Sequence, residues 1–251
     1  MYNVIICSVF KNESHILDEW IKHYLCRGVD HIYLVNDFST DNYLPILEKY
    51  KDHITCYNND IVTRDVGRQI MIYEKYFRPI LSNSKWVSII DLDEFLYSPA
   101  EKSFKDILEK YKDYSQIRID WLHFGSSGHI QQPDSVVKNF TRRSILDKTK
   151  SYYSYKNIFR SEALLSFNVH LNTVSGQTCM IDYIEGEMVD LVINHYPIQS
   201  LDFFMKVKAI RGDVNNWFDN EGLKRDRAYF DRYDINNIED LRLYNQNKYI
   251  H

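Results

Sequence analysis

The sequence predicts one α/β domain built on a mostly parallel, doubly wound sheet, with a small helical extension at its C-terminal end. Three observations lead to this fold class. The first half alternates β-branched apolar runs with amphipathic stretches of helical period, the pattern of successive βαβ units. The length of 251 residues suits one large domain. Because no repeat or low-complexity linker divides the chain, we expect two halves, residues 1–98 and 99–212, and an extension over 213–251.

The first βα unit has the clearest pattern. Residues 3–10 form an apolar, β-branched run, which predicts a buried strand. Residues 14–25 carry apolar side chains at helical spacing and begin next to two capping residues, Asn12 and Ser14. Gly28 is expected to end this helix.

The following units repeat this arrangement. A strand over 31–36 runs directly into the cluster Asp37-Phe38-Ser39-Thr40-Asp41, whose residue types form turns and helix caps. We then expect, in order, a helix over 43–51, a strand over 53–57, a helix over 67–81 and a buried strand over 86–92.

The second half is less regular. We expect a helix over 103–114, a strand over 116–121, short strands near 155–160, 169–171 and 191–194, and a charged helical segment from Leu201. Right-handed crossovers place the carboxyl ends of parallel strands at one edge of a sheet, where ligands bind. Six polar residues of the first half fall at that edge: Glu13, Asp37, Ser39, Asp41, Asp91 and Asp93.

Composition excludes several classes of protein. The 31 basic and 35 acidic residues give a net charge of −4, whereas general nucleic-acid binders are usually basic, so we expect no nucleic-acid partner. The four cysteines show no CxxC spacing, which argues against a zinc knuckle. No apolar run reaches the about 18 residues of a membrane span, and the N-terminal run is too short for a signal peptide. By default we expect a cytoplasmic protein.

Asp91 and Asp93 carry the strongest chemical signal. They follow the apolar run Val87–Ile90 and are two residues apart, so both carboxylates can reach one cation. Mg²⁺ and Mn²⁺ bind carboxylates together with substrate phosphate oxygens. A bound cation would neutralise the charge that develops on a departing diphosphate. The alternative is a solvated acidic loop.

Other charged residues near strand and helix ends are candidates for the same site. Asp37 can accept a hydrogen bond from a base or a ribose, or it can form a turn. Arg68 and Gln69 open a helix whose N-terminus favours anions, and Arg68 can pair with Asp37, Asp91 or a phosphate. His195 follows an apolar run and can complete a metal site or lie in the core.

Two further cations, Lys206 and Arg211, lie on the late helical segment. They can face a diphosphate or form a solvated helix face. Aromatic residues such as Trp121, Phe124 and Trp217 can stack on sugar rings, although most aromatic side chains belong to a core.

Taken together, these motifs resemble the glycosyltransferase family 2-like and family 92 group. The similarity runs over residues 3–212 and includes Lys11-Asn12-Glu13, Asp37-x-Ser39-Thr40-Asp41 and Asp91-Leu92-Asp93-Glu94-Phe95, which looks like the DxDEF box of that group. Trp121-x-x-Phe124-Gly125-Ser126-Ser127-Gly128-His129 and His195-Tyr196 extend it. Four motifs in the right order make the resemblance specific.

The resemblance implies a GT-A fold and transfer of a sugar, with inversion, from a nucleotide-sugar to a glycan, lipid or protein acceptor. The donor is usually a UDP-sugar and the cofactor Mn²⁺ or Mg²⁺. Residues 1–98 would then bind the donor and 99–212 the acceptor. The implied metal residues are Asp91, Asp93 and His195, and the implied donor-binding residues are Asn12, Glu13, Asp37, Arg68, Gln69, Asp91, Lys206 and Arg211.

The catalytic base does not follow clearly from the resemblance. Asp120 and Glu94 are the candidates that we favour, while Asp182, Glu185 and Glu187 stay open. The loop Gly125–His129 is suited either to close approach to a sugar or to a plain turn. Two other functions remain: a nucleotidyltransferase or phosphohydrolase on a similar sheet, and a degenerate transferase domain that only binds sugar or a partner.

Overall fold

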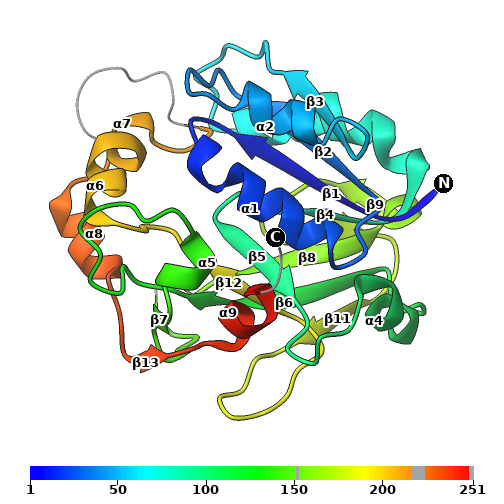
Figure 1. Ribbon diagram of the computed structural model, residues 1–251. Helices are drawn as coiled ribbons and strands as arrows, with labels where there is room; N and C mark the ends of the chain where they lie inside the picture. The colour runs from blue at the N-terminus through cyan, green and yellow to red at the C-terminus, as the bar shows by residue number, and fades with distance from the viewer. Residues whose placement is uncertain (151–152, 216–223, 249–251) are drawn as a thin grey trace.

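A mixed, mostly parallel sheet forms the centre of the molecule (Figure 1). The computed structural model describes residues 1–150, 153–215 and 224–248. Within these residues the strand order is β3-β2-β1-β4-β8-β6-β12-β5, and β11 also pairs with β6. The strands are β1 (Tyr2–Phe10), β2 (His31–Asn36), β3 (Ile54–Asn58), β4 (Ser84–Ile89), β5 (Glu94–Tyr97), β6 (Gln116–His123), β8 (Tyr155–Arg160), β11 (Thr178–Ile181) and β12 (Val192–His195).

Strands β1 to β4 are all parallel, as predicted from the βαβ pattern. In the second half β8 runs antiparallel to both β4 and β6, and β5 runs antiparallel to β12. Strand β6 is parallel to β11 and β12. The carboxyl ends of β1, β2, β4, β6 and β12 therefore meet at one edge, and the predicted fold class is confirmed.

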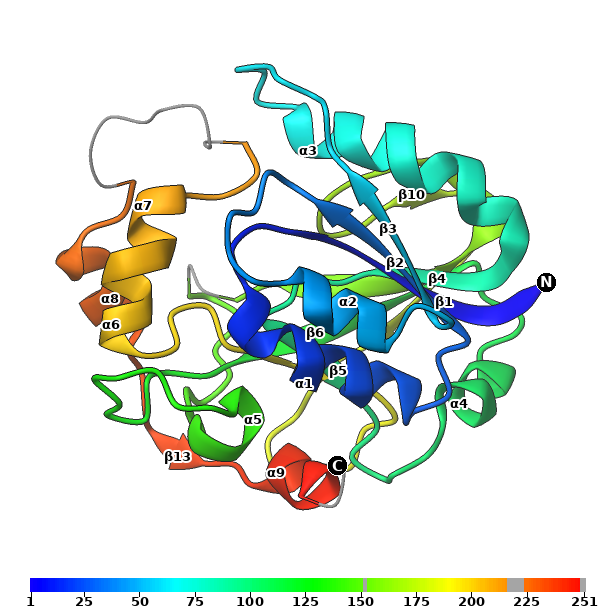
Figure 2. The same cartoon turned by 45° about the horizontal axis from the view of Figure 1, so that its top comes forward.

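Alternate residues of the central strands enter two separate cores, which is why the sheet is covered on both faces. Ile6 and Ile32 pack with the apolar side of α1 (Ser14–Leu25), while Ile5 and Val35 pack with the helical segment from α3 (Arg68–Ile72) to Asn83. That segment continues as a π-helical turn and then a 3₁₀ turn. Figure 2 shows α1 and α2 (Leu44–Lys49) on one face and α3 on the other.

The second half differs from the sequence prediction at several points. Strands β5 and β11 were not predicted, and residues 169–171 form a turn instead of a strand. The physical reason is Asn168, whose Oδ1 accepts hydrogen bonds from the backbone N–H groups of His170 (3.0 Å) and Leu171 (3.3 Å).

Short elements complete the second half and the C-terminal extension. They are α4 (Phe104–Lys110), α5 (Val136–Asn139), β7 (Arg142–Arg143), β9 (Leu164–Ser166), β10 (Thr173–Val174), α6 (Leu201–Phe203), a π-helical turn (Phe204–Lys208), α7 (Ala209–Arg211), α8 (Arg227–Tyr233), β13 (Ile238–Glu239) and α9 (Arg242–Asn247). The extension is tied to the domain, because β13 pairs with β7 and Asn247 Oδ1 accepts a hydrogen bond from Arg27. In the described residues, no helix has the length and apolarity needed to cross a bilayer.

Candidate active site

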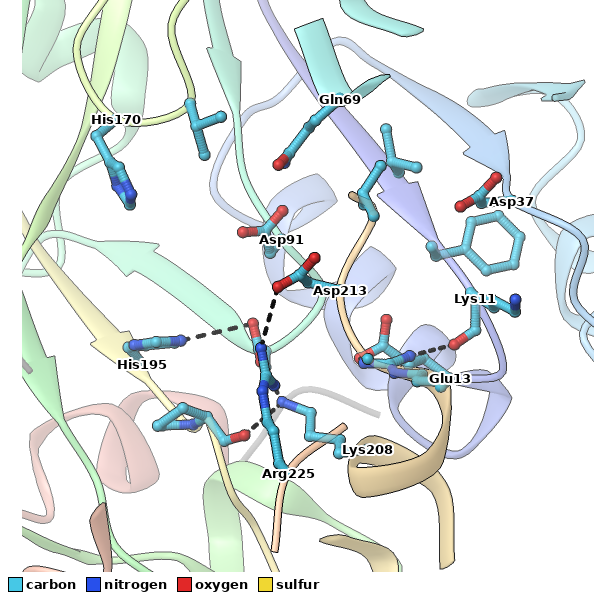
Figure 3. Close-up of a pocket in the computed structure, with 18 of the residues that line it drawn as sticks. Lys11, Glu13, Asp37, Gln69, Asp91, His170, His195, Lys208, Asp213 and Arg225 are labelled. Carbon is cyan, nitrogen blue, oxygen red and sulfur yellow. Dashed lines mark hydrogen bonds and ion pairs between the residues drawn. The ribbon is translucent and has the colours of Figure 1, made fainter. Parts of the chain in front are cut away.

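A cavity of about 310 Å³ opens at the edge where the carboxyl ends of the parallel strands meet. We call it the strand-end cleft. Its lining combines loops after β1, β2 and β4 with β12 and the segment that follows α7 (Figure 3). Its polar lining residues are Lys11, Glu13, Asp37, Gln69, Asp91, Asp93, His170, His195, Lys208, Arg211, Asp213, Arg225 and Tyr229.

The two carboxylates of the strongest motif lie on a tight turn between β4 and β5. The backbone N–H of Glu94 donates to the carbonyl of Asp91 (3.0 Å), which closes the turn over residues 91–93, here called the acidic turn. The indole of Trp20 and the hydroxyl of Tyr24, both on α1, donate to the carbonyl of Glu94 (3.1 and 3.0 Å). These contacts fix the turn, so that Asp91 and Asp93 line the cleft while the Glu94 side chain is fully buried.

The acidic turn is held by two ammonium groups from the second half. Lys156 on β8 donates to Asp91 Oδ2 (2.9 Å), and Lys208 in the turn after α6 donates to Asp93 Oδ2 and to the Pro197 carbonyl (2.6 Å). Both lysine side chains are nearly inaccessible to solvent. Such buried ammonium groups need their carboxylate partners.

Burial and charge act in opposite directions on these groups. Burial disfavours the charged form of Lys156, but the carboxylates of Asp91 and Glu94 more than offset it and raise the pKa of the ammonium. Burial also opposes ionisation of Asp93, yet the charge of Lys208 lowers the pKa of Asp93 below its usual range. We infer that Asp93 and Lys208 face each other as charged groups.

Every carboxylate that the described residues contribute to the cleft has a cationic neighbour. Besides the two pairs of the acidic turn, these are Glu13 with Arg211 (2.7 Å), Asp37 with Arg68 (2.5 Å) and Asp213 with Arg225 (3.5 Å). Figure 3 shows the last of these pairs as the dashed line between Asp213 and Arg225.

His195 lies at the end of β12 and faces the acidic turn. Its Nε2 is 3.8 Å from Asp93 Oδ1, and its ring packs on Trp121 at 4.1 Å between centroids. Burial lowers the pKa of His195 well below 6.5, so the imidazole is neutral. Together with Asp93 and Glu94 it forms a group whose ligand atoms all lie within 4.8 Å of one another.

At the other end of the cleft, hydrogen bonds from Arg68 and Asn59 fix the Asp37 carboxylate. Arg68, which is fully buried, donates to Oδ1 (2.5 Å) and Oδ2 (2.9 Å), and Asn59 Nδ2 donates to Oδ1 (2.7 Å). Of the partners that the sequence allowed for Arg68, the structure therefore selects Asp37. Gln69 lines the cleft directly, and its amide donates to Tyr73 (2.7 Å).

Several predicted site residues lie outside the cleft. Asn12 and Lys206 line a neighbouring cavity of about 680 Å³. Asn12, at a φ of 52°, ties the loop after β1 to that after β2 by accepting the Thr40 N–H (2.7 Å). Lys206 is exposed and pairs with Asp202 (2.7 Å). Arg68 does not line the cleft itself, but it donates to two residues that do, Asp37 and Val214.

The two favoured candidates for the base are also outside the cleft lining. Both oxygens of Asp120 are engaged by Tyr153, by the Tyr183 N–H and by Lys148. The Glu94 carboxyl accepts the Asp91 N–H (3.1 Å) beneath the acidic turn. The open alternatives Asp182, Glu185 and Glu187 do not line the cleft either.

The loop that starts at Gly125 approaches the protein's own chain. A Cβ at Gly125 would lie 2.5 Å from Asn236 Oδ1 and 2.8 Å from the Ile235 carbonyl. The backbone N–H groups of Ser126 and Ser127 donate to Asp234 and Asn236 (2.7 and 2.9 Å). Of the two interpretations of this loop, the structure favours the turn. Trp217 lies outside the described residues.

Sequence reasoning missed several cleft residues and their partners, among them Lys156, His170, Asp213, Arg225 and Tyr229. A lysine within the expected strand Tyr155–Arg160 was a usable signal, because a lysine that is buried in a strand needs a carboxylate partner. His170 and Arg225 lie in irregular segments, and no local pattern marks them.

Comparison with known proteins identifies the family. The sequence profile described as "Glycosyltransferase family 92" matches residues 77–242. The chain belongs to glycosyltransferase family 92. A family 92 protein of Ricinus communis is 25% identical over 243 residues, which are 90% of this chain and 42% of the relative. One of Oryza sativa subsp. japonica is 25% identical over 242 residues, 90% of this chain and 39% of the relative.

The chain thus spans about two-fifths of the length of these curated relatives. Among solved structures, Staphylococcus aureus TarS (residues 1–349) is similar with a TM-score of 0.47 and 13% identity, covering 77% of this chain and 60% of that one. Family membership confirms the predicted resemblance to the family 92 group.

Proposed function

We propose that this family 92 chain transfers a sugar from a UDP-sugar to an acceptor hydroxyl, with inversion at the anomeric carbon and with Mn²⁺ or Mg²⁺ as cofactor. One observation carries the proposal. The acidic turn and the cations Lys208 and Arg211 line the same cleft, at the sheet edge where α/β proteins bind nucleotides. A diphosphate with its cation needs this combination of carboxylates and positive charges.

The residues present fit a divalent cation. Asp93 Oδ1 and His195 Nε2, 3.8 Å apart, both face the cleft, and this separation suits two ligands of one ion. A histidine must be neutral to bind a metal, and burial keeps His195 so. Asp93 and His195 would hold the ion, which when bound neutralises charge on the departing diphosphate. Asp91 would stay with Lys156 and accept hydrogen bonds from metal-bound water.

The other cleft residues would bind the donor. Asp37, preorganised by Arg68, offers a carboxylate oxygen to a uracil N–H or a ribose hydroxyl at one end. Lys208 and Arg211 lie beside the acidic turn, where they can bind diphosphate oxygens. With the nucleoside at Asp37 and the diphosphate at the acidic turn, the anomeric carbon would lie toward the side of the cleft that carries His195 and His170. The acceptor class, whether glycan, lipid or protein, is left open.

The first experiment is thermal unfolding with UDP, GDP, ADP and a set of UDP-sugars, each with Mn²⁺, Mg²⁺ or EDTA. A ligand at 100 times its Kd adds roughly 2.7 kcal/mol to the free energy of unfolding. We expect UDP and at least one UDP-sugar to raise Tm with Mn²⁺ and much less with EDTA. An absence of any nucleotide-dependent shift would contradict the proposal.

A pair of variants makes this test specific. Asp93→Asn removes a proposed ligand and should abolish the Mn²⁺-dependent part of the shift. Lys206→Ala, outside the cleft, should leave the shift unchanged. Inversion is checked by proton NMR of the first sugar released from an α-linked donor, which should have the β configuration.

A further inference from the structure

His170 occupies the end of the cleft opposite Asp37. Figure 3 shows the two residues on opposite sides of the view, with Asp91 between them. His170 is held there by the turn over residues 168–172, in which Asn168 Oδ1 accepts its backbone N–H. If the nucleoside lies at Asp37 and the diphosphate at the acidic turn, His170 lies where the acceptor must approach.

The contacts of Nδ1 favour one tautomer of the imidazole. Nδ1 lies 3.3 Å from the Tyr155 carbonyl oxygen, which can only accept, and 3.2 Å from Ser154 Oγ, which can accept or donate. A proton on Nδ1 satisfies the carbonyl and leaves the lone pair on Nε2, and the proposal below uses this tautomer. Among the residues that the structure describes, none forms a hydrogen bond with Nε2, so its lone pair is available to a ligand.

The ring is also held in place and neutral. Trp121 packs edge-on against it at 5.5 Å between centroids, and Tyr155 does so at 6.4 Å. Burial, followed by the positive charge of Lys156, lowers the pKa of His170, so the imidazole is unprotonated near pH 7.

The cleft carboxylates are less suited to take a proton. Each of them is already paired with a cation, as described above, whereas no described residue forms a hydrogen bond with His170 Nε2. His195 is the second neutral imidazole of the cleft, but it faces Asp93 as a proposed metal ligand. Among the cleft residues that the structure describes, His170 therefore combines two features. Its Nε2 has no hydrogen-bond partner, and it lies at the end of the cleft where the acceptor must approach.

We propose that His170 is the general base of sugar transfer and that the acceptor hydroxyl binds at its Nε2. This inference rests on the proposed function. The acceptor oxygen forms a bond to the anomeric carbon while the bond from that carbon to the diphosphate oxygen breaks. The hydroxyl proton moves to Nε2, and the bonding electron pair leaves with the nucleoside diphosphate.

The test compares two nucleophiles that differ in their need for a base. Water must lose a proton when it attacks the donor, whereas azide carries its negative charge already. UDP-galactose, UDP-glucose and UDP-N-acetylglucosamine are incubated with Mn²⁺, with and without sodium azide. Free sugar and glycosyl azide are then measured by NMR.

His170→Asn is the informative variant, because its side-chain amide can still donate to the Tyr155 carbonyl but cannot act as a base. We expect hydrolysis to fall about 10²-fold or more, glycosyl azide formation to stay within threefold, and Tm and UDP affinity to be unchanged. His53→Asn, an exposed histidine far from the cleft lining, should change neither product.

The outcomes separate the two proposals. Unchanged hydrolysis in His170→Asn, or an equal loss of both products, would overturn the role of His170 and leave the proposed function intact. If the unmodified protein forms neither product from any of the three donors, the proposed function fails and this inference fails with it.

Discussion

The two ends of the strand-end cleft are built from different parts of the chain. Asp37 and its partner Arg68 lie 31 positions apart, and both belong to the first half. The ammonium groups at the acidic turn, Lys156 and Lys208, lie 65 and 115 positions from the carboxylates they contact. The Asp37–Arg68 pair therefore forms within the parallel part of the sheet, and residues 214–215 add hydrogen bonds to Arg68 and Gln69, whereas the acidic turn has its charge partners only when both halves have packed together.

The largest expected effect comes from breaking the Asp37 end. Arg68→Met leaves the buried Asp37 carboxylate without its guanidinium and removes the hydrogen bonds to the Ile61 and Val214 carbonyls. Removing one partner of a buried pair typically costs about 3–5 kcal/mol. We expect a loss of that size in the free energy of unfolding, measured by urea titration. A loss below about 1 kcal/mol would show that solvent reaches Asp37.

A smaller effect is expected at the acidic turn. Lys156→Met leaves Asp91, whose side chain is 37% exposed, and Glu94, whose pKa burial raises well above its usual range. Water can solvate the first carboxylate and a proton can neutralise the second, so we expect a loss of about 1–3 kcal/mol. Lys85→Met, an exposed lysine on β4, is the matched control and should change stability by less than about 0.5 kcal/mol.

The difference in sequence separation between the two ends of the cleft also explains which site residues could be predicted from the sequence. Strands β1 to β4 and their helices show local periodicity, and the order of parallel strands then places Glu13, Asp37, Asp91 and Asp93 at one edge without further information. These four cleft carboxylates were therefore predictable from residue patterns alone, whereas Asp213 was not.

Arg211 was a candidate from the sequence, but Lys156 and His170 were not predictable in this way. Lys156 meets Asp91 because β8 inserts antiparallel between β4 and β6, a pairing between distant segments that no local pattern encodes. His170 is positioned by a turn that Asn168 forms in place of the expected strand. Asp120 lies at the end of the pairing between β6 and β8. Its carboxylate contacts Arg118 and Lys148 and accepts hydrogen bonds from Tyr153 and the Tyr183 N–H. Except for Arg118, these partners come from distant segments, so the sequence around Asp120 could not reveal them.

A third prediction concerns the contact between α1 of the first half and α9 of the C-terminal extension. His23 on α1 is fully buried between the Leu96 carbonyl (2.8 Å) and the Asn247 side chain (3.3 Å). Burial, followed by the charge of Arg27, lowers its pKa well below 6.5. The folded state therefore binds fewer protons than the unfolded state, and the stability that His23 contributes is complete above pH 6.5 and lost as the pH falls below it.

Each pH unit below 6.5 should cost up to about 1.4 kcal/mol for this proton. Urea titrations at pH 7.5, 6 and 5 measure the slope, and His23→Gln should reduce it. An identical slope in that variant would assign the acid sensitivity to other groups.

The smallest effect should come from a pair outside the cleft. Lys206 and Asp202 form an exposed i,i+4 pair, and such pairs contribute little. Lys206→Ala should change the free energy of unfolding by less than about 0.5 kcal/mol and leave donor hydrolysis unaltered. A clear loss of turnover would instead extend the donor site into the neighbouring cavity.

The close contact at Gly125 bears on how short a working version of this domain can be made. Asp234 and Asn236 cap the backbone N–H groups of Ser126 and Ser127, and the absence of a side chain at position 125 lets that segment lie against the end of β6. A chain trimmed after residue 212 would keep the residues from the acidic turn to Arg211. It would lose the contacts that Asp234 and Asn236 make with Ser126 and Ser127. A shortened version that keeps these contacts therefore has to extend beyond Asn236.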